Sequence, residues 1–527
     1  MADEKPLLFV RQASGLTRAI STWPALFWGL GVSFIPWHYY LFTAIPTWFP
    51  GVNLPFIYFV GGAIVLLEVT AMALCYVAMP RSGSIYIPVS RAVSPLLGIM
   101  EATRSFITNP VQRGVTAFIA AGAIASMFST VGRLAGDQGL VNMGQALSAN
   151  PWNLVALAIF FNFVGWVVNV LGPRIMARWV LFWGAGSFLT ILLINGLLAS
   201  ASPDVVRARW DATFGAGAYD EVLRVAQAGG FTPPTISWEP TLAALLLPVS
   251  NTWPYTLMPV VGEVEKPRRN IPLSMMGGAA ILMVVNTLTA FNYMRLFGTF
   301  GNAYAFVTSN PDLAGQLTLT PVLPIDLSLF ATVIAAGSLP LALLVAFGPQ
   351  WGNFADVVVN ENFTSRPLFA MAMDRMGPEI FARVHPRFHS PWVGSTYWFL
   401  VTLSTSILSG AYVETVSAIV FGITFVYGLA RLFQHLAEIE LPYTRPEIYR
   451  SGITIEIAGI PLMTILGAFS AGLFLYLLAT LPANPVYSAA MIGVIYTLGA
   501  IIYFYYAQKN MKRGISPRDI YAEIPPE

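Results

Sequence analysis

Charged residues and cysteine are scarce in this chain of 527 residues. Lys, Arg, Asp and Glu together make up 10% of the sequence, whereas an average soluble protein carries roughly 25%. Cys75 is the single cysteine, which excludes a disulfide framework. The net charge of +2 and the lack of a basic stripe argue against nucleic acid as a partner. Because 56% of the residues are hydrophobic, the composition predicts a lipid environment.

The sequence also lacks the short motifs of nucleotide-binding and hydrolytic sites. It has no P-loop, no His-Glu-x-x-His zinc motif and no Gly-x-Ser-x-Gly nucleophile elbow. We therefore expect a protein that is not an enzyme and has neither a cofactor nor a bound metal. A channel would require a ring of charges or a repeated filter, and neither is present. Residues 1–22 lack the apolar core of a secretory signal, so we expect the first span to serve as its own insertion signal.

Long apolar stretches are abundant. About 20 apolar residues cross the hydrocarbon core as one helix, and on this basis the sequence predicts an all-α membrane protein with twelve spans. The first six lie at 23–46, 55–79, 96–131, 152–171, 178–200 and 240–261. The second six lie at 272–298, 326–358, 392–410, 412–431, 455–480 and 486–507.

The 28 Lys and Arg residues are distributed unevenly between the two sides of these spans. Most fall in loops on one side, and these include Arg91, Arg104, Arg366 and Arg431. The other side has Arg133, Arg207, Arg209 and Arg224. Because positive residues collect on the cytoplasmic side, we expect a multi-pass protein of the plasma membrane with both termini in the cytoplasm.

The longest outer loop, at 201–239, contains a predicted short helix, Tyr219–Ala228. This helix would either cap the outer entrance or act as a plain solvated connector.

Four loop sequences resemble those of a known family. They read Met79-Pro-Arg-Ser-Gly-Ser-Ile-Tyr86, Gly262-Glu-Val-Glu-Lys-Pro-Arg-Arg-Asn-Ile-Pro272, Ser365-Arg-Pro-Leu-Phe-Ala370 and Leu441-Pro-Tyr-Thr-Arg-Pro446. In order and spacing they resemble the loops of the amino acid–polyamine–organocation superfamily of permeases, which has P-R-x-G-x-x-Y and E-x-x-x-P-R-R-x-x-P at the first two places. Since the prolines end helices, these loops indicate the fold and not the solute.

The resemblance implies an inverted repeat of five plus five helices followed by two C-terminal helices. Helices 1 and 6 of this fold are discontinuous, and the solute binds between the two breaks. The expected organisation is a cytoplasmic N-terminus (1–22), a first repeat (23–200), an extracytoplasmic loop (201–239), a second repeat (240–431), a cytoplasmic loop (432–454), helices 11 and 12 (455–507) and a cytoplasmic C-terminus (508–527).

Prolines in polar surroundings mark a candidate break in each half. A proline lacks an N–H and clashes with the carbonyl four residues earlier, and a free carbonyl in hydrocarbon is costly unless it lines a polar cavity. We predict a solute-binding site between the two breaks, with a simple kink at each proline as the alternative. The first break supplies Ser33, Phe34, Ile35, Pro36, Trp37 and His38, and the second supplies Ser250, Asn251, Thr252, Trp253 and Tyr255.

Both breaks depart from the pattern of the family. The first is usually a glycine-rich run, where backbone N–H groups contact a substrate carboxylate, and the second is usually G-x-E or G-x-D. Here the stretch from Ser33 to Trp37 has no glycine, and Trp253-Pro-Tyr255 stands at the second place. These bulky residues weaken the inference to an ordinary α-amino acid and leave a different solute open.

Polar residues of the second and third spans complete the candidate site. Asn109 and Arg113 belong to the third span, which lines the substrate chamber in the family, and Arg113 could bind a solute carboxylate through two N–H groups. The alternative is an ion pair between Arg113 and Glu68 of the second span. Glu68 could itself carry a coupling proton.

The coupling ion is open between a proton and sodium. Some family members have a lysine inside the fifth span, but residues 179–189 contain none. Sodium would bind carbonyl and hydroxyl groups such as those of Val32 and Ser338. His38 could titrate near neutral pH or serve in packing. Phe421 and Phe425 in the tenth span are candidate gate residues, although their spacing is also typical of helix packing.

Together these patterns predict a secondary active transporter of amino acids or related small organic ions that works by alternating access. Its expected partners are the solute and the lipid bilayer, with a second copy of the chain or a membrane complex left open. The alternative is a non-transporting member of the family that acts as a solute sensor or as a structural subunit. The altered glycine motifs support this alternative.

Overall fold

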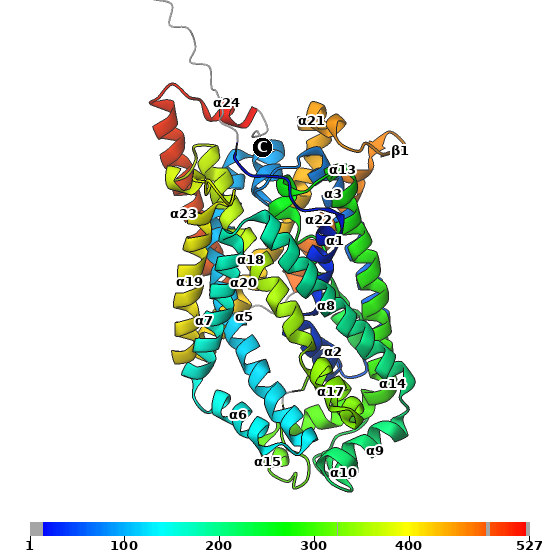
Figure 1. The fold of residues 1–527 in the computed structure, drawn as a ribbon. Coiled ribbons are helices and arrows are strands. Elements are labelled where there is room, and N and C mark those ends of the chain that lie inside the picture. The colour runs from blue at the N-terminus through cyan, green and yellow to red at the C-terminus, as the bar shows by residue number, and fades with distance from the viewer. Residues whose placement is uncertain (1–13, 324, 481–484, 523–527) are drawn as a thin grey trace, which may run out of the picture.

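The structure is a computed structural model that describes residues 14–323, 325–480 and 485–522 (Figure 1). Within these residues the chain is helical apart from one hairpin, β1 (Glu456–Ile457) paired with β2 (Ile460–Pro461). Long helices run side by side in one bundle, and shorter helices cover its two ends. Eight helical segments of the described chain are long and apolar enough to cross a membrane, so the prediction of a helical membrane protein is confirmed.

The long elements of the first half begin with a broken segment. Its parts and the helices that follow are α1 (Thr22–Gly31), η1 (Val32–Phe34), α2 (Pro36–Trp48), α3 (Leu54–Ala78), α5 (Pro95–Ala135), α7 (Pro151–Val170) and α8 (Pro173–Ser200). The second half also begins with a broken segment. Its elements are α11 (Trp238–Ala244), α12 (Leu246–Asn251), η3 (Met258–Glu263), α13 (Pro267–Pro272), η4 (Leu273–Gly277), α14 (Gly278–Ser309), α18 (Gly348–Met373), α19 (Trp392–Ala411) and α20 (Val413–Thr444). The chain continues with α22 (Leu462–Thr480) and α23 (Pro485–Met511).

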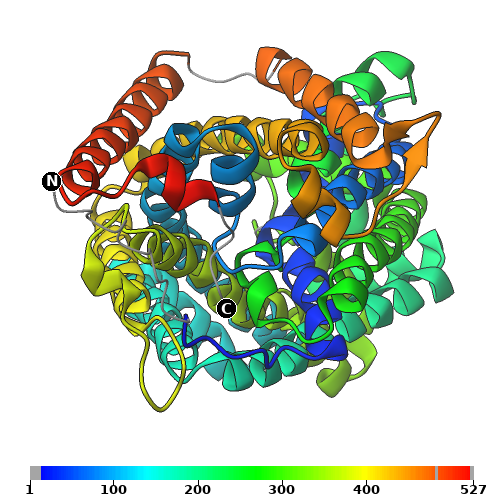
Figure 2. The ribbon, with the colours of Figure 1, turned by 90° about the horizontal axis from the view of Figure 1, so that it is seen from above.

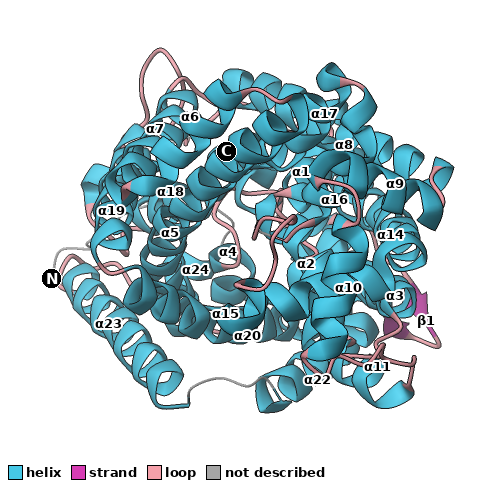
Figure 3. Ribbon diagram, turned by 90° about the horizontal axis from the view of Figure 1, so that it is seen from below, coloured by secondary structure: helices cyan, strands magenta, loops and turns pink. Residues whose placement is uncertain are grey.

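Short helices connect these elements. One end of the bundle holds α4 (Tyr86–Pro88), η2 (Val89–Val93), η6 (Glu379–Ala382), α21 (Pro446–Ser451) and α24 (Pro517–Ala522). The opposite end holds α6 (Gln138–Ala149), α9 (Pro203–Phe214), α10 (Ala218–Ala228), α15 (Pro311–Ala314), α16 (Leu327–Ile334), η5 (Ala335–Gly337) and α17 (Leu339–Ala346) (Figure 3).

Local chemistry explains the interruption of the first segment. Ile35 has an extended backbone, with φ −78° and ψ 169°, because the proline that follows disfavours the helical conformation. The helix restarts with Pro36 in its first turn, where the missing N–H costs nothing. The sixth predicted span is interrupted in the same way. Its helix α12 ends before Thr252, which is extended, and residues 254–257 form turns that begin at Pro254. Both predicted breaks are therefore present.

Several predicted boundaries were wrong. The eighth span, predicted at 326–358, is instead Leu339–Met373, which contains α17 and α18, and the residues before it form the separate short helix α16. The reason is that Asp326 caps the N-terminus of α16, whereas Pro340 and Pro349 start new helices. The predicted loop at 432–454 begins as helix, because α20 continues to Thr444.

The outer loop at 201–239 has more structure than predicted. The expected helix is present as α10, and α9 precedes it. Glu221 of α10 accepts hydrogen bonds from the backbone N–H groups of Thr318, Leu319 and Thr320. The loop thus forms a packed layer over α14 rather than a plain connector.

The predicted loop positions of four arginines were wrong. Arg91, Arg104, Arg366 and Arg431, which were counted in loops, are buried within the bundle. They lie in helices or in the compact turn of η2, and each contacts a carboxylate. The sign of the loop asymmetry is unchanged, but fewer loop residues contribute to it.

The C-terminal helix α24 covers one end of the bundle (Figure 2). Its Tyr521 is 2% exposed, the Tyr521 hydroxyl lies 3.2 Å from that of Tyr86, and Arg445 donates to the Tyr521 carbonyl at 3.1 Å. The helix α24 is therefore tied to Tyr86, which follows α3, and to Arg445, which follows α20.

Candidate functional site

The start of α2 and the end of α12, one part of each broken segment, contact each other directly. Trp37 Nε1 donates to Asn251 Oδ1 at 2.9 Å, and His38 Nε2 donates to the carbonyl oxygen of Asn251. The rings of His38 and Trp253 meet edge to face with centroids 5.0 Å apart. Because Asn251 is the last residue of α12, these contacts join the two breaks.

The inner halves meet through small residues. A Cβ at Gly29 would lie 2.8 Å from the carbonyl oxygen of Pro254, so only glycine permits this approach. Thr256 Oγ1 donates to the carbonyl of Trp28 at 2.9 Å. A Cβ at Gly31 would overlap the backbone of Gly184 in α8. The glycines that precede the first break therefore serve helix packing here.

The remaining predicted residues of the breaks are mostly buried. Ser33 Oγ donates to the carbonyl of Gly29 at 3.0 Å, and Ser250 Oγ donates to that of Leu247 at 3.1 Å, so both hydroxyls bond within their own segment. Phe34, Ile35 and Thr252 are buried, whereas Pro36 is partly exposed.

Arg113 has three hydrogen-bond partners. Its Nη1 donates to Asp356 at 2.7 Å, Nη2 donates to Asn353 at 3.0 Å and Nε donates to Asn162 at 3.3 Å. The Arg113 side chain is 2% exposed and that of Asp356 is 13% exposed. Arg113 therefore pairs with Asp356 of α18, and the alternative of a Glu68–Arg113 ion pair is wrong.

The helix α18 brings this pair next to the first break. Gly352 lies so close to the carbonyl of Phe34 that any Cβ there would overlap it. Asn353 and Asp356 follow on the same helix, within about one turn. The sequence thus placed Arg113 within a span but did not identify Asp356 as its partner.

Asn109, one turn before Arg113, bonds to other helices. Its Nδ2 donates to the carbonyl of Ser105 at 2.8 Å and to that of Phe363 at 3.2 Å. Its Oδ1 accepts a hydrogen bond from Tyr427 of α20. Asn109 therefore links α5, α18 and α20 and makes none of the contacts that join the two breaks.

Glu68 belongs to a different cluster, which connects α3 with α20. Its Oε1 accepts a hydrogen bond from Arg431 Nε at 2.7 Å and lies 3.1 Å from His435 Nε2. The second break reaches this cluster through Tyr255, whose ring centroid lies 4.0 Å from the Arg431 guanidinium carbon. The two broken segments are thus flanked by two buried ion pairs, Arg113–Asp356 and Arg431–Glu68.

Sequence reasoning missed Asp356, Arg431, His435 and Glu438. An acid within the predicted eighth span was a signal for Asp356, since charges at membrane depth are costly and need partners. The other three lie at or beyond the predicted end of the tenth span at 431. The apolar residues Phe433, Leu436 and Leu441 could have indicated that the helix continues.

Phe421 and Phe425, the predicted gate, lie in the part of α20 whose side chains are outside the described residues. Their role stays a prediction.

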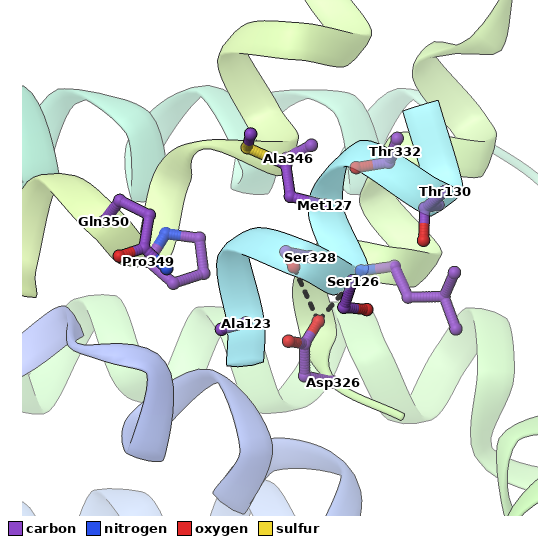
Figure 4. A pocket seen from close by; sticks show the side chains of 11 residues that line it. Ala123, Ser126, Met127, Thr130, Asp326, Ser328, Thr332, Ala346, Pro349 and Gln350 are labelled. Atoms are coloured by element: carbon purple, nitrogen blue, oxygen red, sulfur yellow. Dashed lines mark hydrogen bonds between the residues drawn. The ribbon is translucent and has the colours of Figure 1, made fainter. Parts of the chain in front are cut away.

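A small pocket lies toward the C-terminal end of α5, between this helix, α16 and the start of α18 (Figure 4). Polar side chains from all three helices line it, including Ser126, Thr332 and Gln350. Asp326 at its edge accepts hydrogen bonds from Ser328 Oγ at 2.6 Å and from the backbone N–H of Leu329 at 2.9 Å. None of the residues predicted from the sequence lines this pocket.

Comparison with known proteins fits this architecture. The profile of a family described as amino acid permease matches residues 20–506, which includes both broken segments and all the long helices up to α23. A comparison with curated proteins gives no match. The match covers most of the chain, and we conclude that the protein belongs to the amino acid permease family of the amino acid–polyamine–organocation superfamily.

Proposed function

We propose that the protein is a secondary active transporter of amino acids or related small organic ions that works by alternating access, with the solute bound between the two breaks. The observation that carries this proposal is the direct contact of Trp37 and His38 with Asn251 across the broken segments. A family of permeases also implies transport rather than catalysis. Broken helices at membrane depth are a recurrent device for solute binding in transporters.

We assign the spans to an inverted repeat. In this arrangement spans 1–5 and 6–10 form the two repeats, α22 and α23 are helices 11 and 12, and both termini lie in the cytoplasm of a cell whose plasma membrane holds the protein. The occurrence of one broken segment at the start of each half supports this assignment.

The Arg113–Asp356 pair supports a solute that carries both charges. A carboxylate can receive hydrogen bonds from the Arg113 guanidinium, and an ammonium group can donate to Asp356, the more exposed partner. A zwitterionic amino acid fits both groups at once. The hydrogen bonds from Arg113 to Asn353 and from Asn353 to Gln350 lead from this pair toward the outer pocket, which is the entry that we propose.

We propose a proton rather than sodium as the coupling ion. Ser338, a candidate sodium ligand, is exposed in the turn before α17 and does not belong to a spanning helix. Glu68, by contrast, is fully buried beside the second break and has titratable neighbours.

A sensor or structural subunit is the second candidate function. Trp37 and Trp253 stand where small residues are usual in the family, and Trp37 is hydrogen-bonded to Asn251 of the other break. A protein of this kind would bind a solute or a membrane partner without moving the solute across the bilayer.

A thermal-shift screen of the purified protein against amino acids, amines and small carboxylates tests solute binding. We expect a stabilising solute, since a ligand at roughly 100 times its Kd adds about 2.7 kcal/mol. Trp37→Phe, which removes one N–H, should reduce the shift, whereas Trp23→Phe at an exposed position of α1 should not. If no compound shifts the wild type, or if both variants respond alike, the proposed site is wrong.

A further inference from the structure

A cluster of titratable side chains lies between α3 and α20, fully enclosed by the bundle. Glu68, His435 and Glu438 are each 0% exposed. His435 Nδ1 lies 2.9 Å from Glu438 Oε2, and His435 Nε2 lies 3.1 Å from Glu68 Oε1. Each ring nitrogen of one imidazole therefore faces a carboxylate oxygen.

If the imidazole is neutral and both carboxylates are ionised, the cluster has too few hydrogens to make both nitrogen–oxygen contacts hydrogen bonds. A neutral histidine carries one N–H, and an ionised carboxylate has none to donate. One of the two nitrogen–oxygen contacts would then bring two lone pairs together. A single additional proton, either on the second ring nitrogen or on one carboxylate, makes both contacts hydrogen bonds.

The charges of the neighbouring side chains also indicate one additional proton. The positive group in contact with the cluster is Arg431, which binds Glu68 Oε1 and contacts the ring of Phe474 from α22. Two ionised carboxylates and one arginine leave one unbalanced negative charge, which is expensive at this depth.

The other neighbours of the cluster do not balance this charge. Gln434 of α20 donates to Glu438 Oε1 at 2.9 Å, and Tyr76 of α3 donates to Gln434 at 3.0 Å. Cys75 of α3 lies beside Glu438 and Gln434, and Met258 of η3 accepts a hydrogen bond from Tyr76. Within the described residues Glu68 Oε2 has no hydrogen-bond partner.

We propose that Glu68, His435 and Glu438 form a proton-binding site that holds one proton. The site communicates with the second break through Arg431, whose guanidinium contacts Glu68 on one side and the ring of Tyr255 on the other. A movement of Tyr255 when solute binds would shift Arg431 relative to Glu68. When the proton leaves, it passes to water, and Glu68 and Glu438 are then both ionised beside a neutral imidazole.

Nitrogen NMR of the protein labelled with ¹⁵N-histidine tests the proton count directly, because the chain has 4 histidines. His385→Gln and His389→Gln remove the two histidines of the loop before α19 and leave His38 and His435. At pH 7.5 we expect one of two results. Either His435 has hydrogen on both ring nitrogens, or it has one ring hydrogen and the protein shows a carboxylic-acid C=O infrared band. Glu68→Gln or Glu438→Gln should remove that band. Glu438→Gln should leave His435 with one ring hydrogen, because an amide N–H can donate to the other nitrogen. A neutral His435 without a carboxylic-acid band in the folded wild type would overturn the proposal.

The link to transport rests on the proposed function and has a separate readout. In proteoliposomes, His435→Asn should retain solute exchange but lose at least tenfold of the accumulation driven by an inward proton gradient. Unchanged accumulation by a folded His435→Asn variant would overturn the coupling role. A lack of uptake by the wild type would count against the proposed function and would leave the proton count to the NMR experiment.

Discussion

Deeply buried arginines in the described part of the chain each lie against a carboxylate. The pairs are Arg91–Asp374, Arg104–Glu101, Arg113–Asp356, Arg366 with Glu263 and Glu361, and Arg431–Glu68. An isolated charge in the bundle would be strongly unfavourable, whereas a hydrogen-bonded pair offsets much of the desolvation cost. Arg104–Glu101 lies within α5 and Arg366–Glu361 within α18, whereas the other pairs connect different elements.

Asp356→Asn should destabilise the protein. The substitution leaves the Arg113 guanidinium buried without a counter-charge, which typically costs about 3 kcal/mol. Thermal unfolding in detergent should show a clear loss in this variant and partial recovery in Arg113→Gln/Asp356→Asn. Arg207→Gln is the matched control, because the Arg207–Asp220 pair is exposed and contributes at most about 1 kcal/mol. Equal melting temperatures of Asp356→Asn and the control would contradict this account.

Glu221 predicts a pH-dependent contact at the outer surface. Burial acts to raise the pKa of its carboxyl, but hydrogen bonds from Thr318, Leu319 and Thr320 outweigh it and hold the pKa below its usual value. A carboxyl with a lowered pKa stabilises the fold above its unfolded pKa of about 4.3, and this contribution is lost as the pH falls through the folded-state value.

Hydrogen exchange of residues 315–323, corrected for intrinsic rates, measures this contact. In the wild type we expect protection at neutral pH that declines below about pH 4.3. Glu221→Gln should be less protected at neutral pH and less sensitive to acid, whereas Glu239→Gln, at an exposed position, should behave as the wild type. Wild-type protection in Glu221→Gln would exclude the carboxylate as the anchor.

At the scale of elements, the two broken segments are the features that the sequence predicted best. Proline removes a hydrogen bond wherever it occurs, so Pro36 and Pro254 gave a local signal that needs no tertiary information. The boundaries of α18 and α20 were harder, because polar residues such as Asp356 and His435 interrupt the apolar pattern by which spans are found. Their tertiary partners make these polar residues tolerable in the bundle, and such partners are not visible along the chain.

The close crossing of α1 and α8 is another property of the elements. A methyl group at Gly31 would overlap the backbone of Gly184, so the helices must separate to accept it. Gly31→Ala should therefore destabilise the protein by about 1–3 kcal/mol. Gly196→Ala, also on α8, has open space at the Cβ position and should be neutral or slightly stabilising. Thermal unfolding of both variants checks this, and a tolerated Gly31→Ala would refute the crossing.

At the scale of the whole molecule, the family and the helical membrane fold followed from loop motifs and composition. The partners of Arg113 and Glu68 could not be predicted in this way, because each pair joins residues far apart in the sequence, such as Arg113 with Asp356. Two hydrogen bonds, from Arg113 to Asn353 and from Asn353 to Gln350, connect the Arg113–Asp356 pair with the pocket beside α5, and Gly352 packs against the backbone of Phe34 in the first break. This continuity is what the proposed transport path requires.

Solute uptake into proteoliposomes tests the central claim most directly. With the solute class from the thermal-shift screen, we expect the wild type to accumulate it and Asn251→Ala to lose at least tenfold. The substitution removes the Asn251 Oδ1 that accepts the hydrogen bond from Trp37, whereas the backbone carbonyl that binds His38 remains. Asn142→Ala, at an exposed position of α6, should transport normally. No uptake by folded wild type, or equal uptake by Asn251→Ala, would contradict a solute site between the two broken helices.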